Sequence, residues 1–372
     1  MKVLHVYRTY LPDPPGGIQE TIRQICLATR DVAEPTVFTL SPTPEPSLIQ
    51  RPEARVARCR SWIAPASCDL GGCGAFWTFR KLARAADVVH FHFPWPFADV
   101  LHFATRHGTP SVMTYHSDIV RQRALGMAYR PLMTRMLGSM PAIVATSPAY
   151  ARTSRVLADP RVRGKVRTIP FGIDEKSYPD DADDSILARL GLRDGEAFFF
   201  FIGVMRYYKG IHFLLDAARD VDARIVIAGF GTECLRALAT ERGLSKVIFA
   251  GRIGEAEKVA LLKRCRALVL PSHLRAEAFG MVLVEAAMFA RPMISCEIGT
   301  GTSFVNAAGE TGFVVPPAAP AALAAAMNRL LDDEALAARM GRAARLRYER
   351  LFSSAALGRA YGALYREVTG KK

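Results

Sequence analysis

The chain has 372 residues, about twice the size of a common domain, so its length favours two domains. Half of the residues are hydrophobic and 23% are charged, a globular composition that excludes a disordered or collagen-like chain. The formal net charge is +14, and residues 1–172 carry +11 of it. Such an excess indicates a polyanionic partner, which could be a nucleic acid, an anionic membrane surface or a phosphorylated substrate.

Short continuous apolar runs, turns and amphipathic segments alternate along the whole chain. Such runs are typical of parallel strands that are buried on both faces by helices. We expect strands at residues 3–7, 36–40, 88–93, 111–115, 142–145 and 166–169, and again at 197–204, 224–228, 247–250, 267–270 and 292–296. We expect helices at 18–30, 210–219, 234–242, 255–265, 279–290, 320–331, 334–350 and 354–368.

A break falls near the middle of this pattern. The acidic, proline-bearing segment 178–184 has no apolar period and is expected to be a surface linker. Similar numbers of predicted strands precede and follow it. The sequence therefore predicts an α/β protein made of two doubly wound domains of similar size, with a cleft between them.

Cysteine spacing and the N-terminus indicate the compartment. The seven cysteines show no zinc or redox spacing, so we expect thiols in a reducing cytoplasm, although Cys68 and Cys73 are close enough in sequence to form a disulfide. The N-terminus reaches a proline-rich turn too soon for a signal peptide. The apolar run 197–205 is about half a membrane span. We expect a soluble protein that at most lies against a membrane.

Polar groups at the predicted strand ends of the first half are candidate ligand contacts. Gly16 and Gly17 precede a predicted helix, whose free N–H groups favour an anion, although a structural turn explains them equally well. His90 and His92 share one face of a strand, and with no further ligand in the nearby sequence we expect a hydrogen-bonded pair or a cleft lining rather than a metal site. His116 follows the next strand.

The segment after His116 mixes basic and apolar residues. This pattern is typical of a surface for anionic lipid headgroups, and equally of a solvated helix that packs on a core. The candidate membrane contacts are Arg121, Arg123, Arg130 and Arg135.

The second half holds the strongest constellation. Arg206 and Lys209 follow a buried strand beside glycines, where a guanidinium fork and an ammonium suit a diphosphate. Glu277 and Glu285 are eight residues apart, the first in a loop and the second on the following helix. That helix begins near Phe279, Gly280 and Met281, so its N–H groups can bind phosphate while Glu285 reaches the hydroxyls of a ribose.

These motifs resemble those of the family 4 retaining glycosyltransferases, which have the GT-B fold. The resemblance rests on the E-x₇-E element with its Glu-x-Phe-Gly core and on Lys209, and it covers nearly the whole chain. Further elements occur in the expected order: Gly16-Gly17, His116, residues 170–174, and Gly229-Phe230-Gly231. One departure concerns the arginine after Gly203, where this chain has Val204 and places Arg206 two residues later.

The resemblance implies a domain plan and a role for each motif. The plan is an acceptor-binding domain over 1–174, a nucleotide-sugar-binding domain over 175–353, and a helix over 354–372 that packs back on the first domain. Lys209 and Arg206 are expected to bind the diphosphate, Glu277 the transferred sugar and Glu285 the donor ribose, with His116 close to the reacting centre. The remaining expected donor contacts are Gly16, Gly17, Gly203, Gly229, Gly231, Phe279, Gly280 and Met281.

The implied reaction is the metal-independent transfer of a hexose with retained configuration and no cofactor beyond the nucleotide sugar. Residues 4–10 and 203–210 resemble bacterial enzymes that build O-antigen or exopolysaccharide chains, which implies GDP-mannose or GDP-D-rhamnose as donor, a lipid-linked saccharide as acceptor, and attachment to the inner face of the cytoplasmic membrane. A UDP-sugar donor and a nucleotide-sugar epimerase remain alternatives. A nucleic-acid partner is not expected, because no binding motif accompanies the charge.

Overall fold

The computed structural model describes residues 1–13, 16–65, 68–119 and 123–371, and the side chains of residues 123–125 lie outside the description. The chain divides into two compact units. Unit 1 comprises residues 1–172 together with 354–372, and unit 2 comprises residues 173–353. The chain thus passes from unit 1 to unit 2 at Gly172, and it returns to unit 1 for the last helix.

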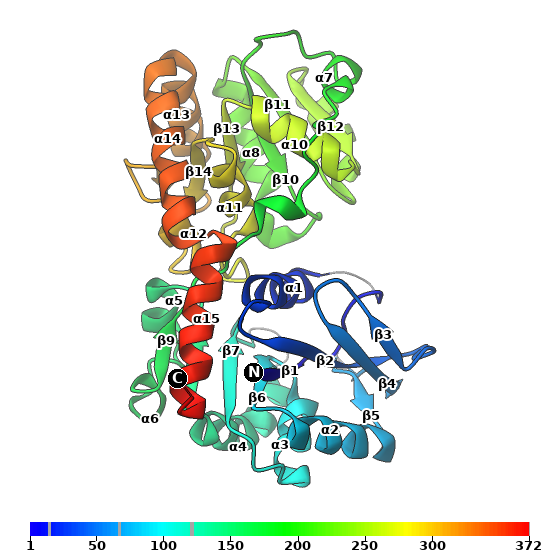
Figure 1. Ribbon diagram of the computed structural model, residues 1–372. Helices are drawn as coiled ribbons and strands as arrows, with labels where there is room; N and C mark the ends of the chain where they lie inside the picture. The colour runs from blue at the N-terminus through cyan, green and yellow to red at the C-terminus, as the bar shows by residue number, and fades with distance from the viewer. Residues whose placement is uncertain (14–15, 66–67, 120–122, 372) are drawn as a thin grey trace. The chain divides into compact units, whose positions relative to one another are not determined.

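Unit 1 is a mostly parallel sheet with helices on both faces (Figure 1). Its strands are β1 (Lys2–Val6), β2 (Glu34–Ser41), β3 (Leu48–Gln50), β4 (Arg55–Ile63), β5 (Leu70–Gly71), β6 (Val88–Phe93), β7 (Ser111–Tyr115), β8 (Ala142–Ala145) and β9 (Val166–Thr168). They lie in the order β3-β4-β2-β1-β6-β7-β8-β9, with β5 beside β4. β3 and β5 run antiparallel to β4, and the other pairs are parallel.

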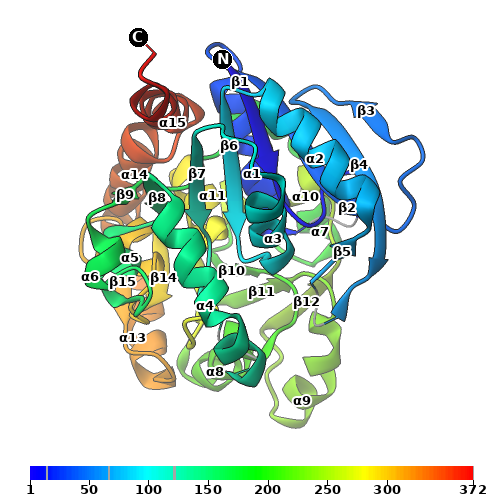
Figure 2. The ribbon, with the colours of Figure 1, turned by 90° about the horizontal axis from the view of Figure 1, so that it is seen from below.

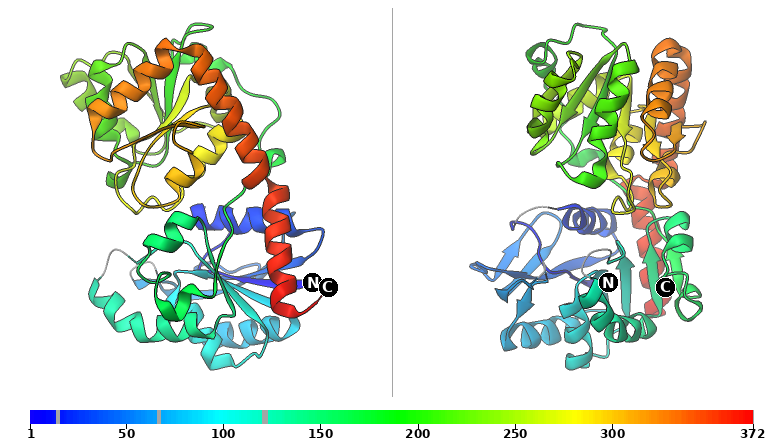
Figure 3. Two further views of the ribbon diagram at one scale, coloured as in Figure 1. Left: turned by 90° about the vertical axis from the view of Figure 1, so that its left-hand side faces the viewer. Right: turned by 180° about the vertical axis from the view of Figure 1, so that it is seen from behind.

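The helices of unit 1 are α1 (Gly17–Thr29), α2 (Cys73–Ala85), α3 (Pro96–Thr105), α4 (Arg123–Ser139), α5 (Pro148–Thr153), α6 (Pro160–Arg163) and α15 (Ser354–Thr369). Helices α1 and α15 pack on one face of the sheet, where Ile25 and Tyr361 share a core with Val3 and Val88. Aromatic side chains of α2 and α3 cover the other face around Phe91. The two termini lie side by side in unit 1 (Figure 3).

Unit 2 is a second parallel sheet, in the order β12-β11-β10-β13-β14-β15. Its strands are β10 (Phe198–Ile202), β11 (Arg224–Ala228), β12 (Val247–Gly251), β13 (Ala267–Leu270), β14 (Met293–Cys296) and β15 (Gly312–Val315). Its helices are α7 (Ser185–Arg189), α8 (Ile211–Ala217), α9 (Arg236–Glu241), α10 (Glu255–Arg264), α11 (Met281–Met288), α12 (Thr302–Val305), α13 (Pro320–Asp332) and α14 (Glu334–Leu351). The expected α/β class with two doubly wound parallel sheets is confirmed.

The segment 178–184 is not the surface linker that its composition suggested. The backbone N–H of Asp183 donates to the carbonyl of Ala256, and Asp184 forms an ion pair with Arg264. The hydroxyl of Tyr178 donates to Glu285. These contacts fix the segment within unit 2, because its polar side chains find partners there despite the missing apolar period.

The net charge is divided very unevenly between the units. Unit 1 contains 26 lysines and arginines against 12 acidic residues, whereas unit 2 contains 23 of each. The whole excess of +14 therefore belongs to unit 1. The polyanionic partner indicated by the composition is therefore expected at unit 1.

Candidate functional site

In unit 2, the loops that follow β10 and β13 bring a lysine and a glutamate together. Lys209 lies in a 3₁₀ turn after β10, and its Nζ donates to Oε2 of Glu277 over 2.5 Å. The same oxygen accepts from Ser272 over 3.2 Å, and Thr300 holds the backbone carbonyl of Glu277. Both partners are largely buried at the carboxyl ends of parallel strands, which is where ligands of such sheets bind.

The charge of Lys209 is maintained in this pair. Burial favours the neutral amine and lowers the pKa of Lys209, but the facing charge of Glu277, with Tyr208 and Glu285, outweighs that effect and raises the pKa above its usual value. Lys209 is therefore a full cation at neutral pH. Because it is largely desolvated, an incoming diphosphate would interact with it more strongly than with a lysine in water.

Glu285 lies in α11 and is held by two side chains that the sequence analysis did not assign. Its Oε1 accepts from Lys258 of α10 over 3.0 Å and from the hydroxyl of Tyr178 over 2.5 Å. Lys258 lies over the ring of Tyr178, and the facing Glu285 overcomes the effect of burial to raise the pKa of Lys258. Both contacts use Oε1, so Oε2 can accept from a ligand hydroxyl.

Glycines allow the strand ends of unit 2 to approach closely. Gly229 has a φ of 126°, and a Cβ there would lie 2.0 Å from the carbonyl oxygen of Gly203. Gly210 has a φ of 69°, and a Cβ there would lie 2.1 Å from the carbonyl oxygen of Pro271. Any other residue would clash with backbone at these two positions, so the glycines determine how the loops around Lys209 pack.

The other predicted donor contacts in unit 2 lie on the same strand ends. Gly231 begins the turn after β11, and Gly280, with a φ of 83°, precedes α11. Phe279 is buried, whereas Met281 is partly exposed at the start of α11. Arg206 is exposed directly before the turn that carries Lys209, and no ion pair holds it among the described residues. The structure thus brings the predicted residues of unit 2 to one end of its sheet.

In unit 1, Gly16 precedes α1 in extended conformation, and Gly17 is its first residue. A Cβ on Gly17 would meet no atom within 4 Å, so no packing requirement accounts for that glycine. A Cβ on Gly16 would lie 2.6 Å from the side-chain oxygen of Gln19. No side chain caps the N-terminus of α1. Its first backbone N–H groups are therefore not occupied by a capping side chain, and such groups can bind an anion.

Four histidines cluster in the core of unit 1. Strands β1, β6 and β7 are neighbours in the sheet (Figure 2). Their register places His5 of β1 opposite His90 of β6, and His92 opposite Thr114 of β7. His5 Nδ1 lies 3.1 Å from His92 Nε2, and His92 Nδ1 lies 3.0 Å from His116 Nε2. His90 and His92, expected to form a hydrogen-bonded pair or a cleft lining, are both hydrogen-bonded, but not to each other, because strands distant in sequence supply His5 and His116 as the partners of His92.

The cluster does not fit a metal site as it stands. Ring nitrogens of His5, His90 and His92 lie within 4.8 Å of one another. However, His90 uses both nitrogens, toward the Tyr365 hydroxyl and Thr114 Oγ1, and His92 uses both toward other histidines. The rings of His90 and His92 are also stacked, 4.3 Å apart, rather than converging on a point. A metal ion would have to replace existing hydrogen bonds.

The predicted membrane arginines belong to α4 and the segment before it. Arg121 lies outside the described residues, and only the backbone of Arg123 is described, at the first position of α4. Arg130 and Arg135 are exposed, and the guanidinium of Arg135 lies 4.6 Å from the ring centre of Phe103. Exposed Met127 accompanies them, so this helix presents a basic and partly apolar surface.

Two carboxylates of unit 1, Asp13 and Asp118, are close in sequence to the candidate site residues Gly16 and His116 and are therefore candidate nucleophiles. Both are hydrogen-bonded to other side chains. Asp13 is buried, accepts from Ser41 over 2.9 Å and faces Arg58. Asp118 accepts from the hydroxyls of Tyr115 and Ser154. The seven cysteines are free, Cys68 and Cys73 included.

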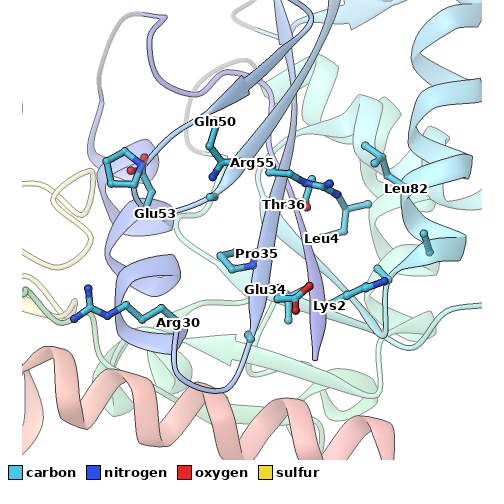
Figure 4. Close-up of a pocket in the computed structure, with 16 residues that line it drawn as sticks. Lys2, Leu4, Arg30, Glu34, Pro35, Thr36, Gln50, Glu53, Arg55 and Leu82 are labelled. Atoms are coloured by element: carbon cyan, nitrogen blue, oxygen red, sulfur yellow. The ribbon is translucent and has the colours of Figure 1, made fainter.

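The structure also contains cavities away from these groups. One of about 520 Å³ in unit 1 is lined by Lys2, Arg30, Glu34, Gln50 and Arg55 among others (Figure 4). It lies at the amino ends of β1, β2 and β4, opposite the end that carries His116. A second, of about 320 Å³, lies at the amino ends of β10, β13 and β14 in unit 2. Neither cavity includes a predicted site residue.

Two family models match the chain. Residues 15–177 match glycosyltransferase family 4, and residues 183–347 match glycosyl transferases group 1. Among curated proteins, the chain is 48% identical to D-rhamnosyltransferase WbpZ of Pseudomonas aeruginosa, over 95% of this chain and 93% of that protein. It is 41% identical to O-antigen chain mannosyltransferase C of Escherichia coli, over the full length of both.

Solved structures show the same fold at low sequence identity. Sucrose-phosphate synthase from Thermosynechococcus elongatus superimposes with a TM-score of 0.78 at 23% identity, covering all of both chains. Anabaena HepE in complex with UDP-glucose gives a TM-score of 0.78 at 20% identity, covering 99% of this chain and all of that one. These likenesses concern the fold alone.

Proposed function

Because the chain belongs to the group 1 and family 4 glycosyltransferases of the GT-B fold, we propose that it transfers a mannose-configured hexose from a GDP-sugar to a lipid-linked saccharide. The observation that carries this proposal is the near full-length similarity to a D-rhamnosyltransferase and an O-antigen chain mannosyltransferase. Since both relatives are named as transferases, the similarity does not favour an epimerase.

The four charged residues predicted in unit 2 each have a chemical role in this proposal. Lys209 neutralises the leaving diphosphate, and Arg206 adds a second cation that is exposed and can move toward it. Glu277 orients Lys209 through Oε2 and accepts from a hydroxyl of the transferred sugar through Oε1. Glu285 accepts from the donor ribose while Lys258 and Tyr178 hold its other oxygen. The positive charges of Lys209 and Arg206 stabilise the negative charge that develops on the leaving diphosphate in the transition state.

Retention of configuration is proposed to occur by same-face substitution. A double displacement needs a carboxylate positioned against the anomeric carbon. Asp13 and Asp118 are occupied by hydrogen bonds to neighbouring side chains, so neither is a suitable nucleophile as placed. In the proposed reaction the leaving diphosphate takes the proton of the acceptor hydroxyl, while Lys209 and the N-terminus of α11 stabilise its charge.

Metal independence is proposed from the position of the charged groups. The chain has two Asp-x-Asp runs, at 181–183 and 220–222. Asp220 and Asp222 precede β11, at the end of the sheet opposite Lys209, and Asp222 pairs with Lys246. Asp183 accepts from Ser185 at the start of α7. In this proposal Lys209, together with Arg206, supplies the positive charge beside the diphosphate.

We propose that unit 1 attaches to an anionic membrane, in keeping with a lipid-linked acceptor. Among the described residues no helix is both long and apolar enough to cross a membrane. The whole excess of positive charge lies in unit 1. In addition to the α4 surface, Trp62 and Ile63 of β4 and Trp77 of α2 are exposed, and the ammonium of Lys81 lies over the Trp77 ring. Tryptophans beside cations are typical of membrane interfaces.

A panel of nucleotide sugars tests the proposal. Binding and acceptor-dependent release of the nucleoside diphosphate are measured for GDP-mannose, GDP-D-rhamnose and matched UDP-sugars with a lipid-linked saccharide. We expect binding and turnover with a GDP-sugar, and loss of binding in Glu285→Ala. The proposal fails if no GDP-sugar binds or if Glu285→Ala behaves as the wild type. Turnover with UDP-sugars alone would replace the GDP assignment.

A further inference from the structure

Three of the clustered histidines form one continuous chain of hydrogen bonds in unit 1. His5 on β1 contacts His92 on β6, and His92 contacts His116 after β7, through ring nitrogens 3.1 and 3.0 Å apart. All three side chains are at most 4% exposed. Strand register creates this arrangement, because β1, β6 and β7 are neighbours and the three residues point to the same face.

Each end of this chain has one buried ring nitrogen without a partner. These atoms are Nε2 of His5 and Nδ1 of His116. Buried polar atoms without partners are rare in folded proteins, and each one requires an explanation. For His116 we take the explanation to be a ligand, since the resemblance to the family 4 glycosyltransferases implies that this residue lies close to the reacting centre.

Each of the three rings can carry its proton on Nδ1 or on Nε2, and the choice at one ring determines the choice at the other two. Burial lowers the pKa of His5 and of His116 to about 3 and that of His92 well below its usual value, so all three rings are neutral and each carries one N–H. If His5 carries its proton on Nδ1, His92 must do the same, and so must His116. If His116 carries its proton on Nε2, the order reverses along the whole chain.

The inner end of the chain decides between these arrangements. A buried N–H without an acceptor is found less often than a buried acceptor without a donor. His5 Nε2 is therefore the bare acceptor, and His5 donates from Nδ1 to His92. His92 then donates from Nδ1 to His116, which is left with its own proton on Nδ1. A substrate oxygen can satisfy that donor, whereas the Nε2 of His5 remains in the core.

We propose that His5 and His92 are positioning residues that hold His116 as the Nδ1–H tautomer, so that it donates to an oxygen of the bound hexose or acceptor. This inference rests on the proposed function, which supplies the substrate for His116. His90 provides a matched control. It is fully buried on the same strand and its ring packs against those of His92 and His5, but its nitrogens bond Tyr365 and Thr114, so it takes no part in the chain of hydrogen bonds.

The test joins a spectroscopic signature to steady-state kinetics. Proteins with ¹⁵N-labelled histidine are compared by long-range ¹H–¹⁵N correlation, and His116→Gln assigns the His116 signals. We expect the Nδ1–H tautomer at His116 in the wild type and in His90→Leu. We expect its loss in His92→Leu and His5→Leu, and its retention in His5→Asn, whose amide can donate from the position of Nδ1.

Activity follows the tautomer in this proposal. We expect His92→Leu and His5→Leu to lower kcat about tenfold or more with little change in KM for the nucleotide sugar. The reason is that His116 would no longer donate from Nδ1 to the substrate oxygen in the bound complex. His5→Asn should restore kcat to near the wild-type value. If His92→Leu does not fold, the pair His5→Leu and His5→Asn makes the same comparison at the end of the chain.

The spectroscopic result requires no substrate, so it stands apart from the proposed function. An Nε2–H tautomer at His116 in the wild type overturns the inference, and so does an Nδ1–H tautomer that survives in both leucine variants. A tautomer that changes without any change in kcat also overturns it. Failure of every GDP-sugar to bind would overturn the proposed donor while leaving the tautomer result intact.

Discussion

Acidification should destabilise unit 1 selectively, because its core contains four neutral histidines. The pKa of His5 and of His116 is lowered to about 3 by burial, and the pKa values of His90 and His92 also fall well below 6.5. Their folded-state pKa values are depressed, so the unfolded chain binds protons that the folded unit does not. The stability they contribute is complete above pH 6.5 and declines as the pH falls below it.

The size of the effect follows from the unfolded-state pKa of about 6.5. Between pH 7.5 and pH 5.5 each such histidine lowers the free energy of unfolding by about 1.4 kcal/mol, and four histidines lower it by about 5 kcal/mol. Asp99 acts in the opposite direction, because burial raises its pKa to about 7 and its protonation favours the folded state by about 2 kcal/mol over the same range. His102, whose pKa burial lowers to about 4, adds about 1 kcal/mol to the loss, and the lowered pKa of His107 acts in the same direction. We expect a net loss of about 4 kcal/mol or more.

Tryptophan fluorescence can follow this loss in unit 1 alone. The three tryptophans of the chain, Trp62, Trp77 and Trp95, all belong to unit 1, and Trp95 is fully buried. Urea unfolding monitored by their fluorescence should show a lower free energy of unfolding at pH 5.5 than at pH 7.5. Between pH 7.5 and 8.5 these histidines should cause no change. Equal or greater stability at pH 5.5 would refute the reasoning.

Three further outcomes are expected. Lys209→Ala should lower kcat about two-hundredfold, equivalent to about 3 kcal/mol of transition-state stabilisation, and a loss below about tenfold in steady-state turnover would contradict its role at the diphosphate. Glu285→Gln should raise KM for the nucleotide sugar about tenfold or more with a smaller effect on kcat, and an unchanged KM in an initial-rate assay would rule out the ribose contact. Binding to anionic vesicles in a sedimentation assay should weaken with added salt and in Arg130→Ala/Arg135→Ala and Trp77→Ala, whereas salt-independent binding would contradict the membrane surface.

Strand positions were predicted most accurately from the sequence where the apolar runs are continuous. The strands 88–93, 111–115 and 224–228 were predicted with the bounds that β6, β7 and β11 have. Strand β4 was missed, because its nine residues interleave arginines with apolar residues and present no continuous run. The short strand β15 was missed for a different reason, since its apolar run of Phe313, Val314 and Val315 is very short and two prolines follow it.

The predicted site lacked the contacts that only the fold can supply. Lys209 and Glu277 were each identified from a local motif, yet their direct ion pair joins residues 68 positions apart. Lys258 and Tyr178 carry no local signal, because neither sits in a recognisable motif and both acquire meaning only by meeting Glu285. His5 is similar, since its role depends on a side-chain hydrogen bond to His92, 87 positions away.

The proposed activity is the stereospecific transfer of a mannose-configured hexose from a GDP-sugar. It is tested most directly by incubating the protein with GDP-mannose or GDP-D-rhamnose and a lipid-linked saccharide, then determining the new linkage by NMR. We predict release of GDP only in the presence of acceptor, and a glycosidic bond with the anomeric configuration of the donor. An inverted linkage, or conversion of the nucleotide sugar without acceptor, would contradict the account.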